Sequence, residues 1–262
     1  MKDDTISIGI PCGPNSEMFA NFLLKSIDLT MSDKADYVCV VGINKPGVDI
    51  ASIIRDVKSD VRVVQEYTEG TGSIGHGECL DLLLKSMTST WGVFVDCDVC
   101  FLHKNWDTEI IHLLRETFDI VGSEYHPAAA KPKDIPNVIF SMFNLQKLKN
   151  LDTTFVPSLK KIKEEAGSVL LDTGCEAILS AKRAGFKMKT LKYVTPSCAD
   201  RGHLTQVLTS GTRGEEYHLN DQVILTHVGR SLSRGAEFDR NHTVNQWLED
   251  ARYYLDKVTQ AL

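Results

Sequence analysis

The 262-residue sequence has no uninterrupted apolar run of about 18 residues, the length at which a membrane-spanning helix is suspected. It also has no excess of basic residues, because 29 Lys and Arg stand against 35 Asp and Glu, for a formal net charge of -6. Proteins that bind nucleic acid are expected to carry a basic surface, so this charge balance disfavours that class. We expect no membrane span and no nucleic-acid partner.

The seven cysteines form no paired or repeated metal-binding pattern. Their number is odd, and the closest pair, Cys97 and Cys100, has no second C-x-x-C motif elsewhere. Each cysteine is therefore predicted to be a reduced thiol that packs as a small hydrophobe. The amino terminus runs directly into a strand-like segment at residues 6–10, which leaves no room for a signal peptide. These features predict a cytoplasmic protein.

Short apolar runs alternate with longer amphipathic segments, which is the pattern of an α/β fold with a mainly parallel sheet covered by helices. The content of 42% hydrophobic and 24% charged residues is that of an ordinary globular protein. Strands are predicted at residues 6–10, 37–43, 61–64, 91–95, 120–122, 137–143, 188–194 and 222–228. Helices are predicted after Asn15 or Ser16, at 48–57, after the glycine-rich residues 70–77, at 107–117, from 144 to about 165, from 171–174 to 185, and at the carboxyl terminus.

Two segments read as loops. Residues 126–137 contain three prolines and three consecutive alanines, and we interpret them as a linker or flap. Residues 195–221 are polar and show little periodicity, so they are predicted to form a functional lid or a disordered loop. The carboxyl-terminal helix has apolar residues at helical spacing and a mixed charge on its other face, which favours packing against the core.

The sequence Asp96-Cys97-Asp98 follows directly after the buried strand at residues 91–95. Like charges a few ångströms apart raise each other's pKa, so two carboxylates at the end of a buried strand call for a positive partner. A hard divalent cation such as Mg²⁺ or Mn²⁺ suits oxygen ligands at this spacing. It would act as a Lewis acid on a leaving phosphate. Open α/β sheets also bind their ligands beyond the carboxyl ends of the strands.

The order of strands, the glycine-rich turn before a helix, and the run Val95-Asp96-Cys97-Asp98-Val99 together resemble GT-A type glycosyltransferases, close to glycosyltransferase family 2. The segment from Ser73 to Asp81 matches the helix that precedes the D-x-D motif in this family. The resemblance covers residues 5–103, and shorter signals follow at 171–174 and 226–229. It implies a single Rossmann-like domain over residues 1–262, with a nucleotide-sugar-binding half at about 1–125 and an acceptor half with a carboxyl-terminal helix at about 137–262.

The resemblance implies a metal site with three ligands. Asp98 matches the usual direct ligand, and Asp96 matches the acid near the ribose or the metal. His227 matches a histidine that often completes the metal shell, and its alternative role is a hydrogen-bonded histidine at a strand end. The implied ion is Mn²⁺ or Mg²⁺.

The resemblance also implies a site for the nucleotide-sugar donor. Pro11, Cys12 and Gly13 stand where the first strand of the family ends against the nucleotide base. Asn44 stands nearest to the place where family members often have an acid that holds the nucleotide, so base recognition departs from the family pattern here.

Four further residues have two interpretations each. His76 and Gly77 lie near a helix start, where free N–H groups favour anions, and we place the donor near them. The alternative is turn chemistry and close backbone packing. Arg230 and Arg234 follow His227 closely, and they could clamp a diphosphate or lie on the solvated surface.

Asp172 resembles the acid that deprotonates or orients the acceptor hydroxyl in inverting members of the family. It is therefore the candidate catalytic base. The alternative is structural, because Thr173-Gly174-Cys175-Glu176 fits a capping box at a helix start. Inverting and retaining stereochemistry both stay open.

The predicted function is metal-dependent transfer of a sugar from a nucleoside-diphosphate sugar to a hydroxyl group of a glycan, lipid or protein acceptor. One alternative is a sugar nucleotidyltransferase, but such enzymes carry basic residues directly after the first strand, and residues 11–16 contain no Lys or Arg. The other alternative is a non-catalytic binding protein, because a fold does not fix a function.

Overall fold

The computed structural model describes residues 4–127, 131–132, 134–158, 161–164, 167–194, 215–228, 245, 247–253 and 255–256. Within these ranges one ten-stranded sheet has the strand order β3-β2-β1-β4-β7-β6-β10-β11-β12-β5. Its strands are β1 Thr5–Cys12, β2 Asp36–Ile43, β3 Val61–Gln65, β4 Trp91–Val95, β5 Val99–Phe101, β6 Ile120–Ser123, β7 Phe140–Asn144, β10 Met188–Val194, β11 Glu215–Leu219 and β12 Gln222–His227. A separate hairpin joins β8 Lys161–Glu164 to β9 Gly167–Leu170.

The sheet is mixed and mostly parallel. Strands β3, β2, β1 and β4 are neighbours in parallel pairs, and β6 pairs in parallel with β10. Strand β7 runs antiparallel to both β4 and β6, so all six of these parallel-paired strands point the same way. Antiparallel strands β11, β12 and β5 complete the sheet beyond β10. The carboxyl ends of β1, β2 and β4 therefore meet at one edge.

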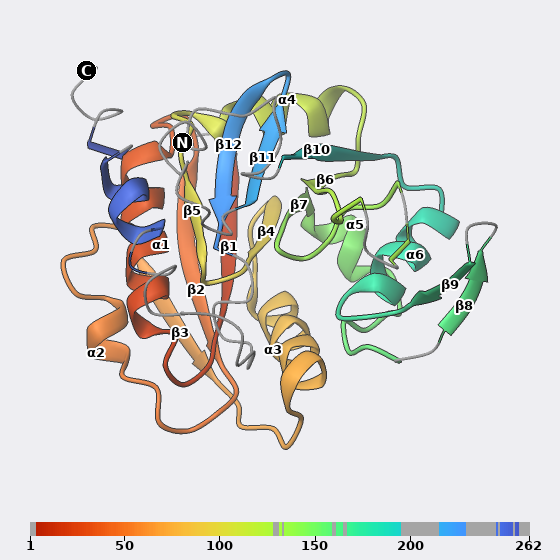
Figure 1. Cartoon of the computed structure of the whole chain (residues 1–262), viewed down its shortest axis with the longest axis horizontal. Helices are drawn as coiled ribbons and strands as arrows, with labels where there is room; N and C mark the ends of the chain where they lie inside the picture. Colours follow the sequence, from red (N-terminus) through yellow and green to blue (C-terminus); the bar gives the residue numbers. More distant parts are fainter. Residues whose placement is uncertain are drawn as a thin grey trace.

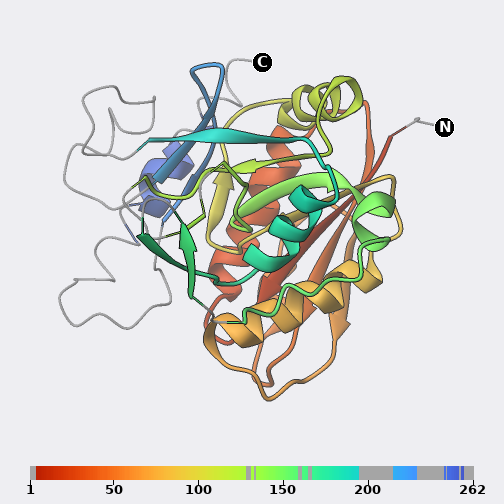
Figure 2. The same ribbon diagram turned by 90° about the vertical axis from the view of Figure 1, so that its right-hand side faces the viewer.

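Helices cover both faces of the sheet, as Figures 1 and 2 show. Buried residues of α1 Glu17–Thr30, α2 Ile50–Ile53 and α4 Trp106–Glu116 pack in one apolar cluster, and those of α3 Gly72–Ser86, α5 Leu145–Lys149 and α6 Cys175–Arg183 pack in a second. The helical residues 247–253 cover a third cluster, in which Trp247 and Leu248 meet Phe19 and Phe22 of α1. The alternating arrangement of an α/β fold is thus confirmed.

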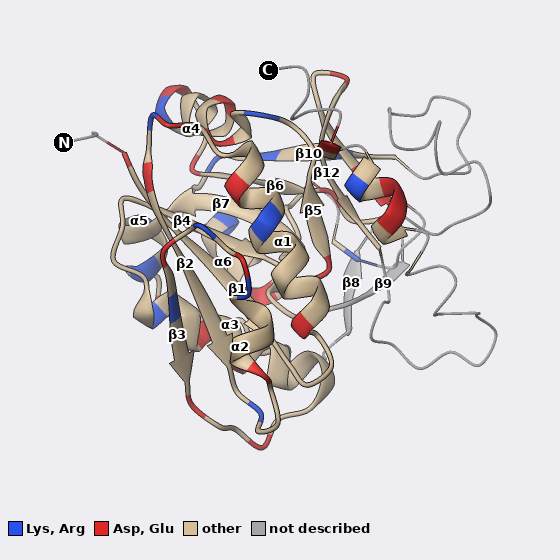
Figure 3. Ribbon diagram, turned by 90° about the vertical axis from the view of Figure 1, so that its left-hand side faces the viewer, with Lys and Arg blue, Asp and Glu red and all other residues tan. Residues whose placement is uncertain are grey.

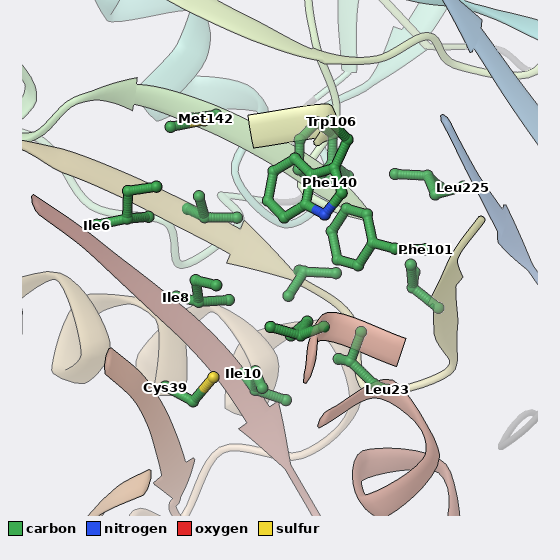
Figure 4. Close-up of a cluster of buried hydrophobic side chains, with 14 of the residues drawn as sticks. Ile6, Ile8, Ile10, Leu23, Cys39, Phe101, Trp106, Phe140, Met142 and Leu225 are labelled. Carbon is green, nitrogen blue, oxygen red and sulfur yellow. The ribbon is translucent and has the colours of Figure 1, made fainter. Parts of the chain in front are cut away.

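The largest core cluster owes its shape to alternation along the strands. Ile6, Ile8 and Ile10 of β1 all point to the face covered by α1 and α4 (Figure 4). At the far end of the same cluster the ring of Phe101 stacks on Trp106, with centroids 4.1 Å apart and an interplanar angle of 8°. Stacking of this kind fixes α4 against β5, the strand that follows the acidic pair.

Figure 3 shows Lys and Arg interspersed with Asp and Glu along the described part of the chain. None of the described helices is both long enough and apolar enough to cross a bilayer.

Two sequence predictions need correction. The helix expected up to residue 165 ends with α5 at Lys149, because Phe155 leaves the helical path to donate its N–H to Asp81 of α3 over 2.8 Å. The following residues form the hairpin β8–β9 instead. Residues 215–219 form β11 where a loop was expected, since they pair with β10 and β12. Residues 195–214 lie outside the described residues.

Candidate active site

A pocket of about 710 Å³ lies beyond the carboxyl ends of β1, β2 and β4. The first turns of α3 and the end of β12 complete its wall. Eight of the residues singled out in the sequence line it, namely Pro11, Cys12, Gly13, Asn44, His76, Asp96, Asp98 and His227. The structure therefore gathers residues from five separate parts of the sequence around one cavity.

Strand pairing brings Asp98 and His227 together. Strand β12 runs antiparallel to β5 with His227 opposite Val99, and the N–H of Val228 donates to the carbonyl of Asp98 over 3.2 Å. Asp96 lies two residues before Asp98 at the end of β4. Each of Asp96, Asp98 and His227 offers one potential ligand atom, and these atoms all lie within 4.8 Å of one another.

Two imidazoles lie against the two carboxylates. His227 Nε2 is 3.2 Å from Asp98 Oδ1, and His76 Nε2 is 3.2 Å from Asp96 Oδ1. Burial acts to lower the pKa of His227, but the carboxylates of Asp98 and Glu215 outweigh it and hold that pKa well above its ordinary value. Burial likewise acts to lower the pKa of His76, but the carboxylates of Asp96, Asp98 and Asp172 together outweigh it and raise that pKa. The pocket is an environment that favours positive charge.

The donor set fits a divalent cation. Asp96 Oδ1 and His76 Nε2 are both buried, and although they lie 3.2 Å apart, neither atom makes a hydrogen bond to a described residue. A buried carboxylate oxygen without a hydrogen-bond donor is costly unless a ligand meets it. Two carboxylates and one imidazole are groups that Mn²⁺ and Mg²⁺ accept in proteins.

The amino terminus of α3 opens into the same pocket. The helix has 15 residues and its first is Gly72, with Thr71 at the N-cap position making no side-chain capping bond. Gly70, Thr71 and Gly72 all line the pocket. The N–H groups of a first helical turn have no partner inside the helix, and together with the helix dipole they favour an anion.

The glycines of α3 allow close packing, and Gly77 does not line the pocket. The helix begins at Gly72, inside the glycine-rich stretch that was expected to precede it. A Cβ on Gly75 would lie 2.5 Å from the carbonyl oxygen of Gly70. A Cβ on Gly77 would lie 2.5 Å from Cα of Val156, so Gly77 faces the backbone of residues 155–156. This packing fits the alternative interpretation of Gly77, and its contact with the donor stays a prediction.

Asn44 joins the end of β2 to α3. Its Nδ2 donates to the carbonyl of Gly75 over 2.5 Å and to Oγ1 of Thr68 over 3.2 Å. Lys45, which sequence reasoning missed, lines the pocket beside it and donates to the carbonyl of Thr68. The position of Lys45 directly after Asn44, at the end of a strand, is the sequence feature that could have identified it as a pocket residue.

Three buried thiols form an apolar part of the pocket wall. Cys12, Cys79 and Cys97 all line the pocket. Burial raises the pKa of Cys79 to about 12 and raises the pKa of the other two as well, so all three are neutral thiols at physiological pH. The six described cysteines are free and buried, which confirms the prediction made for them.

Asp172 lies beside the pocket and is not part of its lining. Its Oδ2 is 2.7 Å from Nζ of Lys131, and its Oδ1 accepts the N–H of Thr173 over 2.8 Å. Burial acts to raise the pKa of Asp172, but hydrogen bonds from Lys131, Ser73 and Thr173 lower it. The segment that contains Asp172 is also bound to α3, because Thr173 Oγ1 donates to the carbonyl of Ser73 over 3.0 Å.

The predicted capping box at this helix start does not form. Gly174 is the N-cap of α6, with φ of 74° and no side-chain capping bond, because Thr173 uses its hydroxyl for α3 instead. Arg230 and Arg234 lie outside the described residues, as does the predicted lid at 195–214.

Comparison with known proteins finds similarity to solved structures at low sequence identity. Neither a protein-family model nor a curated protein matches the sequence. Among solved structures, the chain is similar to the mannosyltransferase PcManGT from Pyrobaculum calidifontis, in complex with GDP-Man and Mn²⁺. The identity is 16% and the TM-score is 0.47, over 71% of this chain and 54% of that one.

Two further solved structures show the same kind of similarity. One is glucosyl-3-phosphoglycerate synthase from Mycobacterium tuberculosis, in complex with Mn²⁺, UDP and glucosyl-3-phosphoglycerate, with 19% identity and a TM-score of 0.49 over 72% of this chain and 69% of that one. The other is TarS 1–349 from S. aureus in complex with UDP-GlcNAc, with 19% identity and a TM-score of 0.43 over 73% and 62%. The similarity is one of fold.

Proposed function

We propose that this chain is a metal-assisted glycosyltransferase that moves a sugar from a nucleoside-diphosphate sugar to a hydroxyl group of an acceptor. The observation that carries the proposal is the meeting of Asp96, Asp98 and His227 with the open amino terminus of α3 in one pocket. A cation site next to an anion site suits a diphosphate, which bears negative charge and binds divalent metals.

Each part of the pocket has a role in this proposal. Asp96, Asp98 and His227 would hold Mn²⁺ or Mg²⁺, which supplies Lewis-acid stabilisation of the leaving diphosphate when bound. The N–H groups at the start of α3 stabilise the same developing negative charge. The nucleotide base lies between the end of β1 at Pro11 to Gly13 and the end of β2 at Asn44 and Lys45. Arg230 remains a proposed ligand of the diphosphate.

The acceptor would approach from the side of α6. Asp172 is the proposed base, since its carboxylate beside the pocket can accept the proton of the acceptor hydroxyl, while the hydrogen bonds that lower its pKa make it a weaker base until they are released. To act as the base, Asp172 must release its ion pair with Lys131 and contact the acceptor hydroxyl in its place. In this scheme residues 1–125 form the donor half and residues 137–262 the acceptor half. The free buried cysteines support the cytoplasmic location that we propose.

The test is calorimetric binding of UDP, GDP, CDP and dTDP with and without Mn²⁺. We expect one of these nucleotides to bind in a metal-dependent manner to the wild-type chain. Asp98→Asn keeps the shape of the side chain and removes its charge, so metal-dependent binding should fall at least tenfold, the lower end of the effect of losing a charged hydrogen-bonding partner. Asp33→Asn changes an exposed carboxylate elsewhere and should bind as the wild type does.

Turnover separates a transferase from a binding protein. We expect the chain to hydrolyse slowly the nucleotide sugar that contains the bound nucleotide, with water as the acceptor. Mass spectrometry detects the nucleoside diphosphate that this reaction releases. Absence of binding for all four nucleotides in the presence of Mn²⁺ would contradict the proposal. If the wild type and Asp98→Asn bind the nucleotide equally well in the presence of Mn²⁺, the part of the proposal that assigns a metal ion to this site is wrong.

A further inference from the structure

Glu215 contacts His227 from the side away from Asp98. Its Oε2 accepts a hydrogen bond from Nδ1 of His227 over 2.9 Å, while Nε2 of the same ring lies 3.2 Å from Asp98 Oδ1. Glu215 and His227 are directly opposite each other in the antiparallel pair β11–β12. Opposite residues in such a pair place their side chains on the same face of the sheet, so the contact follows from the register.

We propose that Glu215 is a positioning residue that presents Nε2 of His227 to the metal ion, an inference that rests on the proposed function. A neutral imidazole has one N–H and one free lone pair, and the hydrogen bond of one nitrogen decides which nitrogen can bind a metal. When a metal ion replaces the proton of Nε2, the Nδ1–H that is donated to Glu215 keeps the Nε2 lone pair on the side of Asp98. Glu215 itself does not line the pocket.

The carboxylate of Glu215 is itself held in place. The hydroxyl groups of Tyr217 and Tyr193 donate to it over 3.1 and 3.3 Å. The hydroxyl of Thr226 donates to its backbone carbonyl over 2.9 Å. These donors come from β10, β11 and β12, so three strands fix the acceptor that orients the ring. A carboxylate with a purely electrostatic surface role would not require hydrogen bonds from two tyrosines.

A second pair of an imidazole and a carboxylate serves as an internal control. Nε2 of His103 lies 2.7 Å from Oε1 of Glu109, and neither residue lines the pocket. Glu109→Ala therefore removes the same kind of partner from a histidine that has no place in the metal site.

The experiment measures Mn²⁺ binding without any nucleotide, from the electron paramagnetic resonance signal of the free ion. We expect Glu215→Ala to raise the dissociation constant by about 10- to 100-fold, the usual effect of losing a partner of a metal-binding histidine. Glu215→Gln keeps an oxygen that can accept from Nδ1–H but loses the charge, so its effect should be smaller. Glu109→Ala should bind Mn²⁺ as the wild type does.

A spectroscopic readout reports on the ring directly. In protein labelled with ¹⁵N-histidine and loaded with Mg²⁺, Nδ1 of His227 should carry the proton in the wild type and in Glu215→Gln, and this preference should weaken in Glu215→Ala. If circular dichroism shows that Glu215→Ala does not fold, Glu215→Gln is used in its place. We then expect Glu215→Gln to bind Mn²⁺ more weakly than the wild type does.

The outcomes separate the two proposals. One outcome is that the wild type binds Mn²⁺ and folded Glu215→Ala binds it with the same dissociation constant. That result would overturn the role of Glu215 and leave the proposed function standing. If only Glu215→Gln folds, an unchanged dissociation constant in that variant has the same meaning. No Mn²⁺ binding by the wild type would overturn both.

Discussion

At the scale of single residues, Gly77 shows how packing constrains a position next to the pocket. Its Cα faces Cα of Val156 and the carbonyl of Phe155, at distances that leave no room for a methyl group. Gly77→Ala should therefore destabilise the fold by about 1–3 kcal/mol, the range for inserting a methyl group into a well-packed site. Urea unfolding of the purified variant measures this directly.

Gly13 provides the matched control. No atom lies within 4 Å of the place where its Cβ would stand, and its φ is not in the left-handed region. Gly13→Ala should unfold at the urea concentration of the wild type or slightly above it. Equal stability of the two variants would show that the backbone of residues 155–156 moves away without cost.

The sequence points to candidate ligands better than to the residues that support them. Asp96 and Asp98 could be singled out because two charges directly after an apolar strand are conspicuous, and His227 because it matches a position of the family that the sequence resembles. Glu215 could not be predicted, since its contact depends on the register of β11 against β12. Gly77 had two interpretations for a related reason. Glycine near a helix start has the same local appearance whether it faces an anion or another backbone.

At the scale of elements, Asp119 connects three of them through a carboxylate. It lies between α4 and β6, and accepts the N–H of Lys187 just before β10 over 2.9 Å and Nζ of Lys147 in α5 over 2.6 Å. Burial acts to raise the pKa of Asp119, but these hydrogen bonds outweigh it and hold the pKa below its usual value. A carboxyl group whose pKa is depressed in the folded state stabilises that state while it is ionised.

Asp119→Asn should lower the free energy of unfolding at neutral pH by about 1 kcal/mol, a modest value because Lys147 is exposed and screened by solvent. The contribution is fully present above the unfolded pKa of about 3.9 and is lost as the pH falls through the lower folded pKa. The stability curves of variant and wild type, from urea unfolding across this range, should therefore converge in acid. A difference that stays constant with pH would contradict the role of the charge.

Helices and strands with strong periodicity could be read from the sequence, and those set by distant contacts could not. Strand β4 occupies the predicted residues 91–95, and α1 buries Phe19, Phe22, Leu23 and Ile27 at the predicted spacing. Strand β5 has three residues and exists because β12 pairs with it. The helix predicted to continue beyond residue 149 does not form, because the backbone N–H of Phe155 donates to Asp81 of α3 instead.

At the scale of the whole molecule, the sheet brings segments that are far apart in the sequence together at the site. The connection between β4 and β5 supplies Asp96 and Asp98, and the last residue of β12 supplies His227. The parallel half of the sheet was predictable from alternating elements. The antiparallel half was not, because the order of β10, β11, β12 and β5 depends on pairings between segments far apart in sequence.

A ligand bound between distant strands should stabilise the entire fold. An ion that binds the folded state and not the unfolded chain adds about 2.7 kcal/mol at a concentration of about 100 times its dissociation constant. For a chain of this size that corresponds to a rise in Tm of roughly 5–10 °C. We therefore expect saturating Mn²⁺ to raise the Tm of the wild type, measured by differential scanning fluorimetry, without any nucleotide present.

Two variants decide whether the effect comes from this site. Asp98→Asn removes one ligand and should abolish most of the rise, whereas Asp33→Asn leaves the pocket intact and should keep it. Because Asp98 also faces His227, its loss removes a carboxylate from the imidazole, so the Tm of Asp98→Asn without metal must be the reference for that variant. An equal rise in all three proteins would place the stabilising ion elsewhere on the chain, whereas a rise confined to proteins with Asp98 would locate it where β5 meets β12.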